Sequence, residues 1–155
     1  VCTGNTCRSP MAESLLRKLL PPALRARIVI KSAGTHSSPG DPATSEATEA
    51  AARRGLDLRG HRAQPLTAEL LRRSDLVLGM ERHHVDAVLA LAPASRDRVH
   101  LVSELHAEPG AEHEGIHDPM GGSPEIYEEC LLRIERHLVR ILPHLEERAV
   151  GERRS

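Results

Sequence analysis

Aromatic residues are almost absent from this chain of 155 residues, which has one Tyr, no Phe and no Trp. A core must therefore be built from Leu, Val, Ile and Ala, and a ligand site has almost no rings for stacking. Proteins that bind single-stranded nucleic acid depend on such stacking. The formal net charge of -1 also provides no broad basic face for a phosphate backbone. We therefore expect no nucleic-acid partner.

Long hydrophobic runs are also absent. No apolar run approaches the roughly 18 residues that cross a bilayer, and no signal segment opens the chain, so we expect no membrane partner. Cys2, Cys7 and Cys130 are too few and too irregular for a disulfide framework, which favours a reducing cytoplasm. The length predicts one domain, assigned to residues 1–148, with residues 149–155 as a loose C-terminal tail.

Short apolar runs alternate with helical patterns along the chain. Because buried strands separated by helices form parallel sheets covered on both faces, the order predicts an α/β fold. We expect a single-domain three-layer sandwich, with a central parallel sheet of about four strands and helices on both faces. The expected strands are residues 28–30, 75–80 and 99–102, and the expected helices are residues 10–20, 44–54, 67–73, 82–91 and a long one from 124.

Several residues are expected to have structural roles in these helices. Ser9 is expected to cap the first helix, and Pro10 to open it. His83 and His84 are expected to face solvent on the helix of residues 82–91. Cys130 falls on the apolar stripe of the last helix, so we expect it in the core.

Chemistry is concentrated in residues 2–10, which have the sequence CTGNTCRSP. Backbone N–H groups of a tight loop and of the first helical turn form an anion-binding site. Gly4 permits close approach of an oxyanion, and Asn5 tolerates a left-handed conformation. Arg8 can donate two hydrogen bonds to phosphate oxygens. Cys2 would lie at the base of this loop, where the same field stabilises a thiolate that can attack a bound phosphoryl group.

The alternative is that Cys2 is a small buried residue and Arg8 a surface charge. That alternative requires the whole C-x5-R-S-P pattern, with Gly and Asn inside it, to be a chance match. A Walker-type nucleotide site is excluded because GxxxxGK is absent. We therefore favour a phosphate-binding loop with a cysteine nucleophile.

The motif CTGNTCRSP resembles the signature of the low-molecular-weight protein phosphatases, which have a small α/β fold. The resemblance extends to SAGT at 32–35, HRA at 61–63, DLVLGM at 75–80 and DPMGG at 118–122. It implies that Cys2 forms a phosphocysteine intermediate and that Arg8 binds the phosphoryl group. The phosphate-binding loop would comprise Thr3, Gly4, Asn5, Thr6, Cys7, Arg8 and Ser9.

The same resemblance implies supporting roles around this loop. Ser9 would donate a hydrogen bond to the thiolate and ease its departure. Asn5 would brace the loop, with Ser32 and His61 as its partners. Cys7 matches the family's second loop cysteine, which can trap the nucleophile as a reversible disulfide under oxidation. No cofactor is implied, and phosphorylated proteins are the expected partners.

Asp118 is the candidate for proton transfer. Phosphoryl transfer to Cys2 needs a proton for the leaving group, and hydrolysis of the intermediate needs a base for water; one carboxyl group can serve both steps. From the sequence alone, a helix-entry Asp in a polar loop is an equal alternative. The resemblance favours catalysis, because the family has an Asp-Pro at this place.

Thr6 and Met120 bear on the substrate. Members that act on phosphotyrosine resemble one another in having an aliphatic residue in place of Thr6 and aromatic residues just after the Asp-Pro. Thr6 and the Gly-Gly-Ser after Met120 instead resemble the protein-arginine phosphatase branch, which often has Phe where this chain has Met120. A guanidinium group favours a hydroxyl and a carboxylate over two rings. We therefore favour phosphoarginine, with protein-tyrosine phosphatase as the alternative.

Two weaker alternatives remain. A thioredoxin-coupled arsenate reductase needs further cysteines, and residues 74–92 contain none. A catalytically silent phosphoryl-binding protein is the other. The family places a hydrophobic strand ahead of the nucleophile, where this chain has only Val1, so we expect that the native protein begins earlier and that this first strand is missing from the sequence. The oligomeric state is not determined by the sequence, and a monomer is expected.

A metal site is not expected. His106, His113 and His117 lie near Glu108, Glu112 and Glu114, but their spacing matches no pattern of metal ligands. A solvated polar loop is the favoured interpretation of this stretch.

Overall fold

The sheet of this α/β protein is narrow. The computed structural model describes residues 1–105, 107 and 114–151. Within these residues, the one hydrogen-bonded ladder joins β1 (Val77–Gly79) and β2 (Val99–Leu101), which are parallel and pair Val77 with Val99. The predicted central sheet of about four strands is therefore wrong in the number of strands, although the parallel direction is correct.

Single bridges extend the sheet beyond β1 at its carboxyl edge. The Val1 nitrogen donates to the Leu78 carbonyl at 2.7 Å, and the Val1 carbonyl accepts from the Met80 N–H at 3.0 Å. Cys2 then forms a parallel bridge with Gly34, and Gly34 forms another with Pro65. The four positions side by side at this edge are therefore β1, Val1–Cys2, Gly34 and Pro65.

Residues 28–30, predicted as a strand, are not one. Val29 is 82% exposed, and a groove of about 620 Å³ is lined by residues 27–33 and by residues 76–78. A β-branched run becomes a strand only where a neighbour lies within reach of backbone hydrogen bonds. The groove keeps residues 28–30 beyond the reach of β1.

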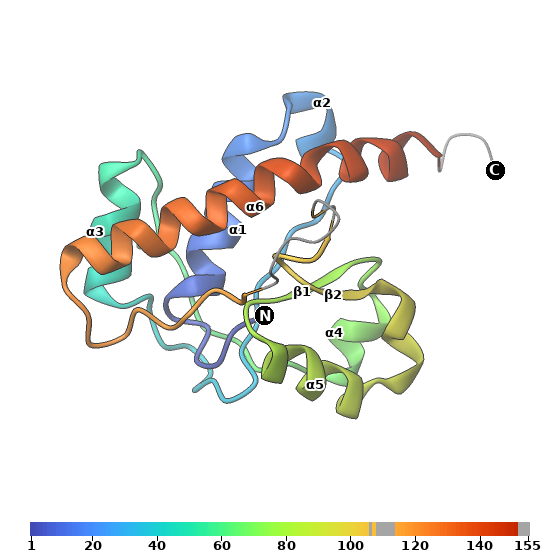
Figure 1. Cartoon of the computed structure of the whole chain (residues 1–155), viewed down its shortest axis with the longest axis horizontal. Coiled ribbons are helices and arrows are strands. Elements are labelled where there is room, and N and C mark those ends of the chain that lie inside the picture. Colours follow the sequence, from blue (N-terminus) through green and yellow to red (C-terminus); the bar gives the residue numbers. More distant parts are fainter. Residues whose placement is uncertain (106, 108–113, 152–155) are drawn as a thin grey trace.

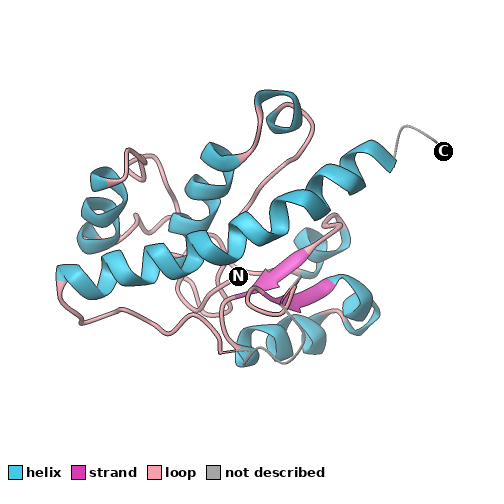
Figure 2. Cartoon of the chain, turned by 45° about the horizontal axis from the view of Figure 1, so that its top comes forward, coloured by secondary structure: helices cyan, strands magenta, loops and turns pink. Residues whose placement is uncertain are grey.

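Helices cover both faces of the sheet, as predicted (Figures 1 and 2). The long helix α6 packs against α1 and α3 on one face, and these three helices enclose the larger apolar core. A second apolar cluster joins β1 and β2 to α4 and α5 on the other face. The helices and the one 3-10 helix are α1 (Arg8–Leu19), α2 (Pro22–Arg25), α3 (Ser45–Arg53), α4 (Ala68–Arg72), α5 (Arg82–Leu91), η1 (Pro93–Arg98) and α6 (Pro124–Gly151).

Two helix ends differ from the predictions. Helix α1 begins at Arg8, with Cys7 at the N-cap and no side-chain cap, instead of beginning after a Ser9 cap. Helix α6 continues to Gly151, so residues 149–151 of the expected tail are helical, and residues 152–155 lie outside the described residues. No helix among the described residues is long and apolar enough to cross a membrane.

The single aromatic residue, Tyr127, lies in the larger core with 2% of its side chain exposed. Cys130 is in the same cluster at 6% exposure, which confirms the prediction that it is a core residue. Leu, Ile, Ala and Met side chains provide nearly all the rest of this core. The chain thus builds its interior without Phe or Trp, and its one Tyr packs in the core.

Candidate active site

The loop of residues 2–7 connects the sheet edge to the first turn of α1. Asn5 at its centre has a φ of 56°, the left-handed conformation that its residue type tolerates. Its side chain holds this conformation, because Nδ2 donates to Ser9 Oγ at 2.8 Å and to Ser32 Oγ at 2.9 Å. The Asn5 backbone carbonyl lies 2.6 Å from His61 Nε2. The structure therefore brings together all four residues that the resemblance assigns to loop support.

Gln64 is a further support that the sequence did not indicate. Its backbone N–H donates to Asn5 Oδ1 at 2.9 Å, and its side chain donates to the Ser32 carbonyl at 2.8 Å. Both the amide nitrogen and the amide oxygen of Asn5 are therefore hydrogen-bonded. Residues Ser32, His61 and Gln64 hold the loop from one side. The only signal of this role is proximity to the HRA motif.

Cys2 lies at the base of the loop with 2% of its surface exposed. Its sulfur is 2.9 Å from Ser9 Oγ. A helix leaves its first N–H groups without intrahelical partners, and the Cys7 N-cap of α1 supplies no side chain to satisfy them. Those N–H groups, together with the loop backbone, form an arrangement that suits an oxyanion.

Thr6 and Gly4 lie next to each other within the loop. A Cβ built on Gly4 would lie 3.3 Å from Thr6 Oγ1. The Thr6 carbonyl accepts a hydrogen bond from the Thr44 N–H at 2.8 Å, which ties the loop to the start of α3. The Thr6 hydroxyl thus lies beside Gly4, on a backbone that is tied to the start of α3.

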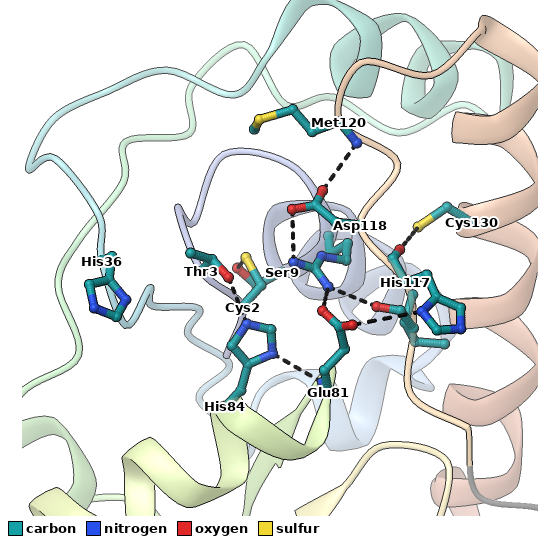
Figure 3. A network of polar contacts seen from close by, with 12 residues as sticks. Cys2, Thr3, Ser9, His36, Glu81, His84, His117, Asp118, Met120 and Cys130 are labelled. Carbon is teal, nitrogen blue, oxygen red and sulfur yellow. Dashed lines mark hydrogen bonds and ion pairs between the residues drawn. The ribbon is translucent and has the colours of Figure 1, made fainter.

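Arg8 is buried, at 2% exposure, and its guanidinium group is held by two carboxylates. Nη1 donates to Glu81 Oε2 and, at 2.8 Å, to the Ile116 carbonyl, while Nη2 donates to Asp118 Oδ2 at 3.1 Å (Figure 3). Two carboxylates and a carbonyl thus place the guanidinium group on the α5 side of the loop. A bound phosphoryl group would compete with Asp118 for Nη2.

Asp118 lies beside Arg8 and is 41% exposed. Its Oδ1 accepts from the Met120 N–H at 3.1 Å, which fixes the carboxylate at the turn after Pro119. The Met120 side chain is 61% exposed next to it (Figure 3). Gly121 has a φ of 79°, a conformation that favours glycine and allows this tight turn. The structure therefore brings Asp118 to Arg8 across 110 residues of sequence, in the same site as Cys2 (Figure 3).

Glu81 is a site residue that sequence reasoning missed. It holds Arg8 with its carboxylate and is also the N-cap residue of α5, where its backbone carbonyl accepts from the His84 N–H at 3.0 Å. One signal could have found it: Glu81 directly follows a buried strand, and in parallel α/β sheets functional side chains gather beyond the carboxyl ends of strands.

The expectation that His84 faces solvent is wrong. Its side chain is fully buried, whereas His83 is exposed. Nδ1 of His84 accepts from the Glu81 N–H at 3.0 Å, and Nε2 lies 2.8 Å from Thr3 Oγ1. Because burial and nearby positive charges penalise the imidazolium form, the pKa of His84 is lowered to about 3.

Burial disfavours the thiolate form of the other two cysteines. Burial is the main cause that raises the pKa of the Cys7 thiol well above its ordinary range, and burial also raises the pKa of Cys130 to about 12. Cys130 Sγ lies 4.0 Å from the His117 carbonyl, on the packed side of α6. All three cysteines are free thiols.

Potential metal ligands meet at one place among the described residues, where ligand atoms of Glu81, His83 and His84 lie within 4.8 Å of one another. Both ring nitrogens of His84 are already hydrogen-bonded, and the Glu81 carboxylate holds Arg8, so this group does not fit a metal ion. Glu114 is 3.6 Å from Arg133, and His117 is 3.8 Å from Glu81. His106, Glu108, Glu112 and His113 lie outside the described residues.

Cysteine-dependent phosphatases typically have a cysteine at the base of an anion-binding loop and an arginine in the helical turn that follows. This chain has both, in a parallel α/β fold. The chain belongs to the low molecular weight phosphotyrosine protein phosphatase family, whose model matches residues 1–151. It is therefore a low-molecular-weight protein phosphatase, a hydrolase that acts on phosphorylated proteins.

Relatives in this family differ in substrate. The low molecular weight protein-tyrosine-phosphatase Etp of Escherichia coli (strain K12) is 40% identical over 136 residues, which cover 88% of this chain and 85% of that protein. The protein-arginine-phosphatase of Bacillus subtilis (strain 168) is 35% identical over 147 residues, 95% of each chain. The solved YwlE arginine phosphatase from Geobacillus stearothermophilus has a TM-score of 0.83 at 30% identity, and the match covers 97% of this chain and 92% of that one.

Proposed function

We propose that this phosphatase hydrolyses phosphoarginine on proteins through a phosphocysteine intermediate on Cys2. The observation that carries the substrate assignment is the lack of an exposed Phe, Tyr or Trp ring near Asp118. The residue after Asp118-Pro119 is Met120, and the chain's one Tyr, Tyr127, is 2% exposed in the core. A phosphotyrosine ring would therefore have no aromatic wall, whereas a guanidinium group needs acceptors such as the Thr6 hydroxyl and a carboxylate.

Cys2 and Arg8 would carry the first step. The Arg8 guanidinium group and the loop N–H groups would bind the phosphoryl oxygens, and Nη2 of Arg8 would exchange Asp118 for a phosphoryl oxygen. The Cys2 thiolate would then attack phosphorus from the side opposite the leaving group. Ser9 Oγ, 2.9 Å from the Cys2 sulfur, is placed to hydrogen-bond the thiolate whenever it is free.

Asp118 would move the protons of both steps. In the first, the N–P bond breaks while a protonated Asp118 gives its proton to the leaving guanidino nitrogen. In the second, the resulting carboxylate takes a proton from water, the oxygen attacks phosphorus and the S–P bond breaks, which releases inorganic phosphate and the Cys2 thiolate. Release from Arg8 on substrate binding would leave the carboxyl group available for this work.

Phosphotyrosine is the second candidate substrate, and the 40% identity with a tyrosine phosphatase favours it. The two candidates are separated by kcat/KM on phosphoarginine and phosphotyrosine peptides of the same sequence, with Cys2→Ser as the inactive control. We expect a higher kcat/KM on phosphoarginine, and preferential hydrolysis of phosphotyrosine would end this assignment.

A Thr6→Ile variant gives a second test of specificity, because it removes the hydroxyl and keeps a β-branched side chain. We expect it to lose turnover of phosphoarginine while turnover of phosphotyrosine is kept or raised. Thr6→Ser is the matched control, since it keeps the hydroxyl beside Gly4. Equal losses on both substrates in Thr6→Ile would show that Thr6 has no part in specificity.

A further inference from the structure

His84 is the buried titratable group that the proposed chemistry does not use. It projects from the first turn of α5 toward the loop of residues 2–7 (Figure 3). The loop supports described above, from Ser32, His61 and Gln64, all act from the other side. Among the described residues, α5 supplies one side chain that hydrogen-bonds to residues 3–7, and that side chain is His84.

The hydrogen bonds of His84 fix its protonation. A backbone N–H can only donate, so Nδ1, which accepts from the Glu81 N–H at 3.0 Å, carries no proton. In the neutral ring the proton is then on Nε2, which donates to Thr3 Oγ1 at 2.8 Å. The ring thus connects a loop residue to the residue that caps α5.

Burial, together with positive charge nearby, keeps the His84 ring neutral. After burial, the groups that lower its pKa are His83, Arg8 and His36. Glu81 is the acidic group next to it, and its carboxylate is engaged by Arg8. A pKa of about 3 keeps Nδ1 unprotonated throughout the neutral range, so the hydrogen bond from the Glu81 N–H stays in place.

Resting on the proposed function of Cys2 and Arg8, we propose that His84 is a positioning residue for the phosphate-binding loop, acting through Thr3. The same turn of α5 holds Arg8 through Glu81 and the loop through His84. Because both contacts leave from this one turn, the loop N–H groups and the guanidinium group keep a fixed relative placement. Loss of the Thr3 contact would weaken phosphoryl binding without touching any reacting group.

Two conservative variants separate the two hydrogen bonds of His84. The Oδ1 of His84→Asn takes the place of Nδ1 and keeps the Glu81 N–H bond, but it does not reach Thr3. The amide nitrogen of His84→Gln takes the place of Nε2 and can still donate to Thr3. At the other end of the contact, Thr3→Val removes the hydroxyl with nearly the same shape, and Thr3→Ser restores it.

The test measures kcat and KM on an activated aryl phosphate and the affinity for inorganic phosphate by calorimetry. For His84→Asn and for Thr3→Val we expect kcat/KM and phosphate affinity to fall about tenfold, or about 1.4 kcal/mol. His84→Gln and Thr3→Ser should stay within about threefold of the wild type. The double variant Thr3→Val/His84→Asn should also lose about tenfold, because both changes break one contact.

Multiplicative losses of about a hundredfold in the double variant would overturn the proposal, because the two residues would then act independently. Unchanged phosphate affinity in His84→Asn would also overturn it. If His84→Asn does not fold, the proposal is tested by comparing the phosphate affinities of Thr3→Val and Thr3→Ser. Equal affinities in these two variants would refute it. Full activity in Cys2→Ser would instead refute the proposed function, and calorimetry of phosphate binding would still test His84.

Discussion

Glu81 gives the sharpest test of how the site is held together. Its carboxylate holds the buried guanidinium group of Arg8, and the residue is also the N-cap of α5. Glu81→Ala removes the contact with Arg8 and keeps the backbone hydrogen bonds to His84, while Glu81→Gln keeps the shape and hydrogen-bonding capacity but removes the charge. Arg8 retains the Ile116 carbonyl and Asp118 in either variant.

The size of the effect follows from these contacts. A hydrogen bond to a charged group contributes about 1.5–3 kcal/mol. Glu81→Ala should therefore lower the free energy of unfolding by about 2 kcal/mol, less than a fully orphaned buried charge would cost. Glu81→Gln should lose about half of that, because a neutral hydrogen bond is roughly half as strong as a charge-assisted one.

Catalytic activity should also fall, because Glu81 holds the Arg8 guanidinium group in position. We expect kcat/KM on an aryl phosphate to drop about a hundredfold in Glu81→Ala and about tenfold in Glu81→Gln. Chemical denaturation and steady-state kinetics measure the two quantities. The matched control is Glu69→Gln, which neutralises an ion pair with Arg72 whose side chains are both more than 60% exposed and should change stability by less than about 0.5 kcal/mol. Wild-type kcat/KM in Glu81→Ala would refute the reasoning.

Three further predictions follow from single contacts. Gly34→Ala places a Cβ 2.5 Å from the Thr3 carbonyl oxygen, so it should lower the free energy of unfolding by about 1–3 kcal/mol and kcat/KM at least tenfold. A Cβ at Gly60 meets nothing within 4 Å, so Gly60→Ala is the control, and equal behaviour of the two variants would contradict this prediction. Because the pKa of His84 is about 3 in the folded chain against 6.5 when unfolded, the unfolded chain binds this proton first as the pH falls. Urea unfolding should therefore show the wild type losing about 2 kcal/mol more than His84→Gln between pH 7 and pH 5, and parallel losses would count against the buried neutral ring. Peroxide should convert Cys2 to a sulfenic acid that condenses with the Cys7 thiol and releases water, so activity should return on reduction in the wild type. In Cys7→Ala, excess peroxide should oxidise the sulfenic acid further to a sulfinic acid that reduction does not reverse; full recovery in that variant would exclude the protective disulfide.

The sequence predicted the parts of the site that are contiguous. The residues that form the loop and the first turn of α1 occur together in CTGNTCRSP, and the family resemblance of this motif implies that Asn5 braces the loop. Contacts between distant elements were harder to predict. Glu81 and His84 reach the loop because β1 delivers the start of α5 to it, and a short apolar run does not specify its neighbours.

Two of the wrong predictions, for His84 and for residues 28–30, have physical causes of the same kind. His83 and His84 are one residue apart on a helix, so a small difference in its rotation decides which of them is buried, and the capping hydrogen bond to Glu81 settles it. The apolar pattern of residues 28–30 suits a strand, but a strand also needs a partner, and a groove lies between these residues and β1. In both cases, contacts with distant parts of the fold determined the structure.

The central claim is that Cys2 becomes covalently phosphorylated, and one measurement tests it directly. An aryl phosphate with a good leaving group needs no acid for the first step, so in Asp118→Asn the slow second step should allow the intermediate to accumulate. Rapid quenching followed by peptide mass analysis should then find one phosphoryl group on the peptide that contains Cys2. A phosphoryl group on another residue, or product formation with no covalent intermediate in this variant and in the wild type, would contradict the account.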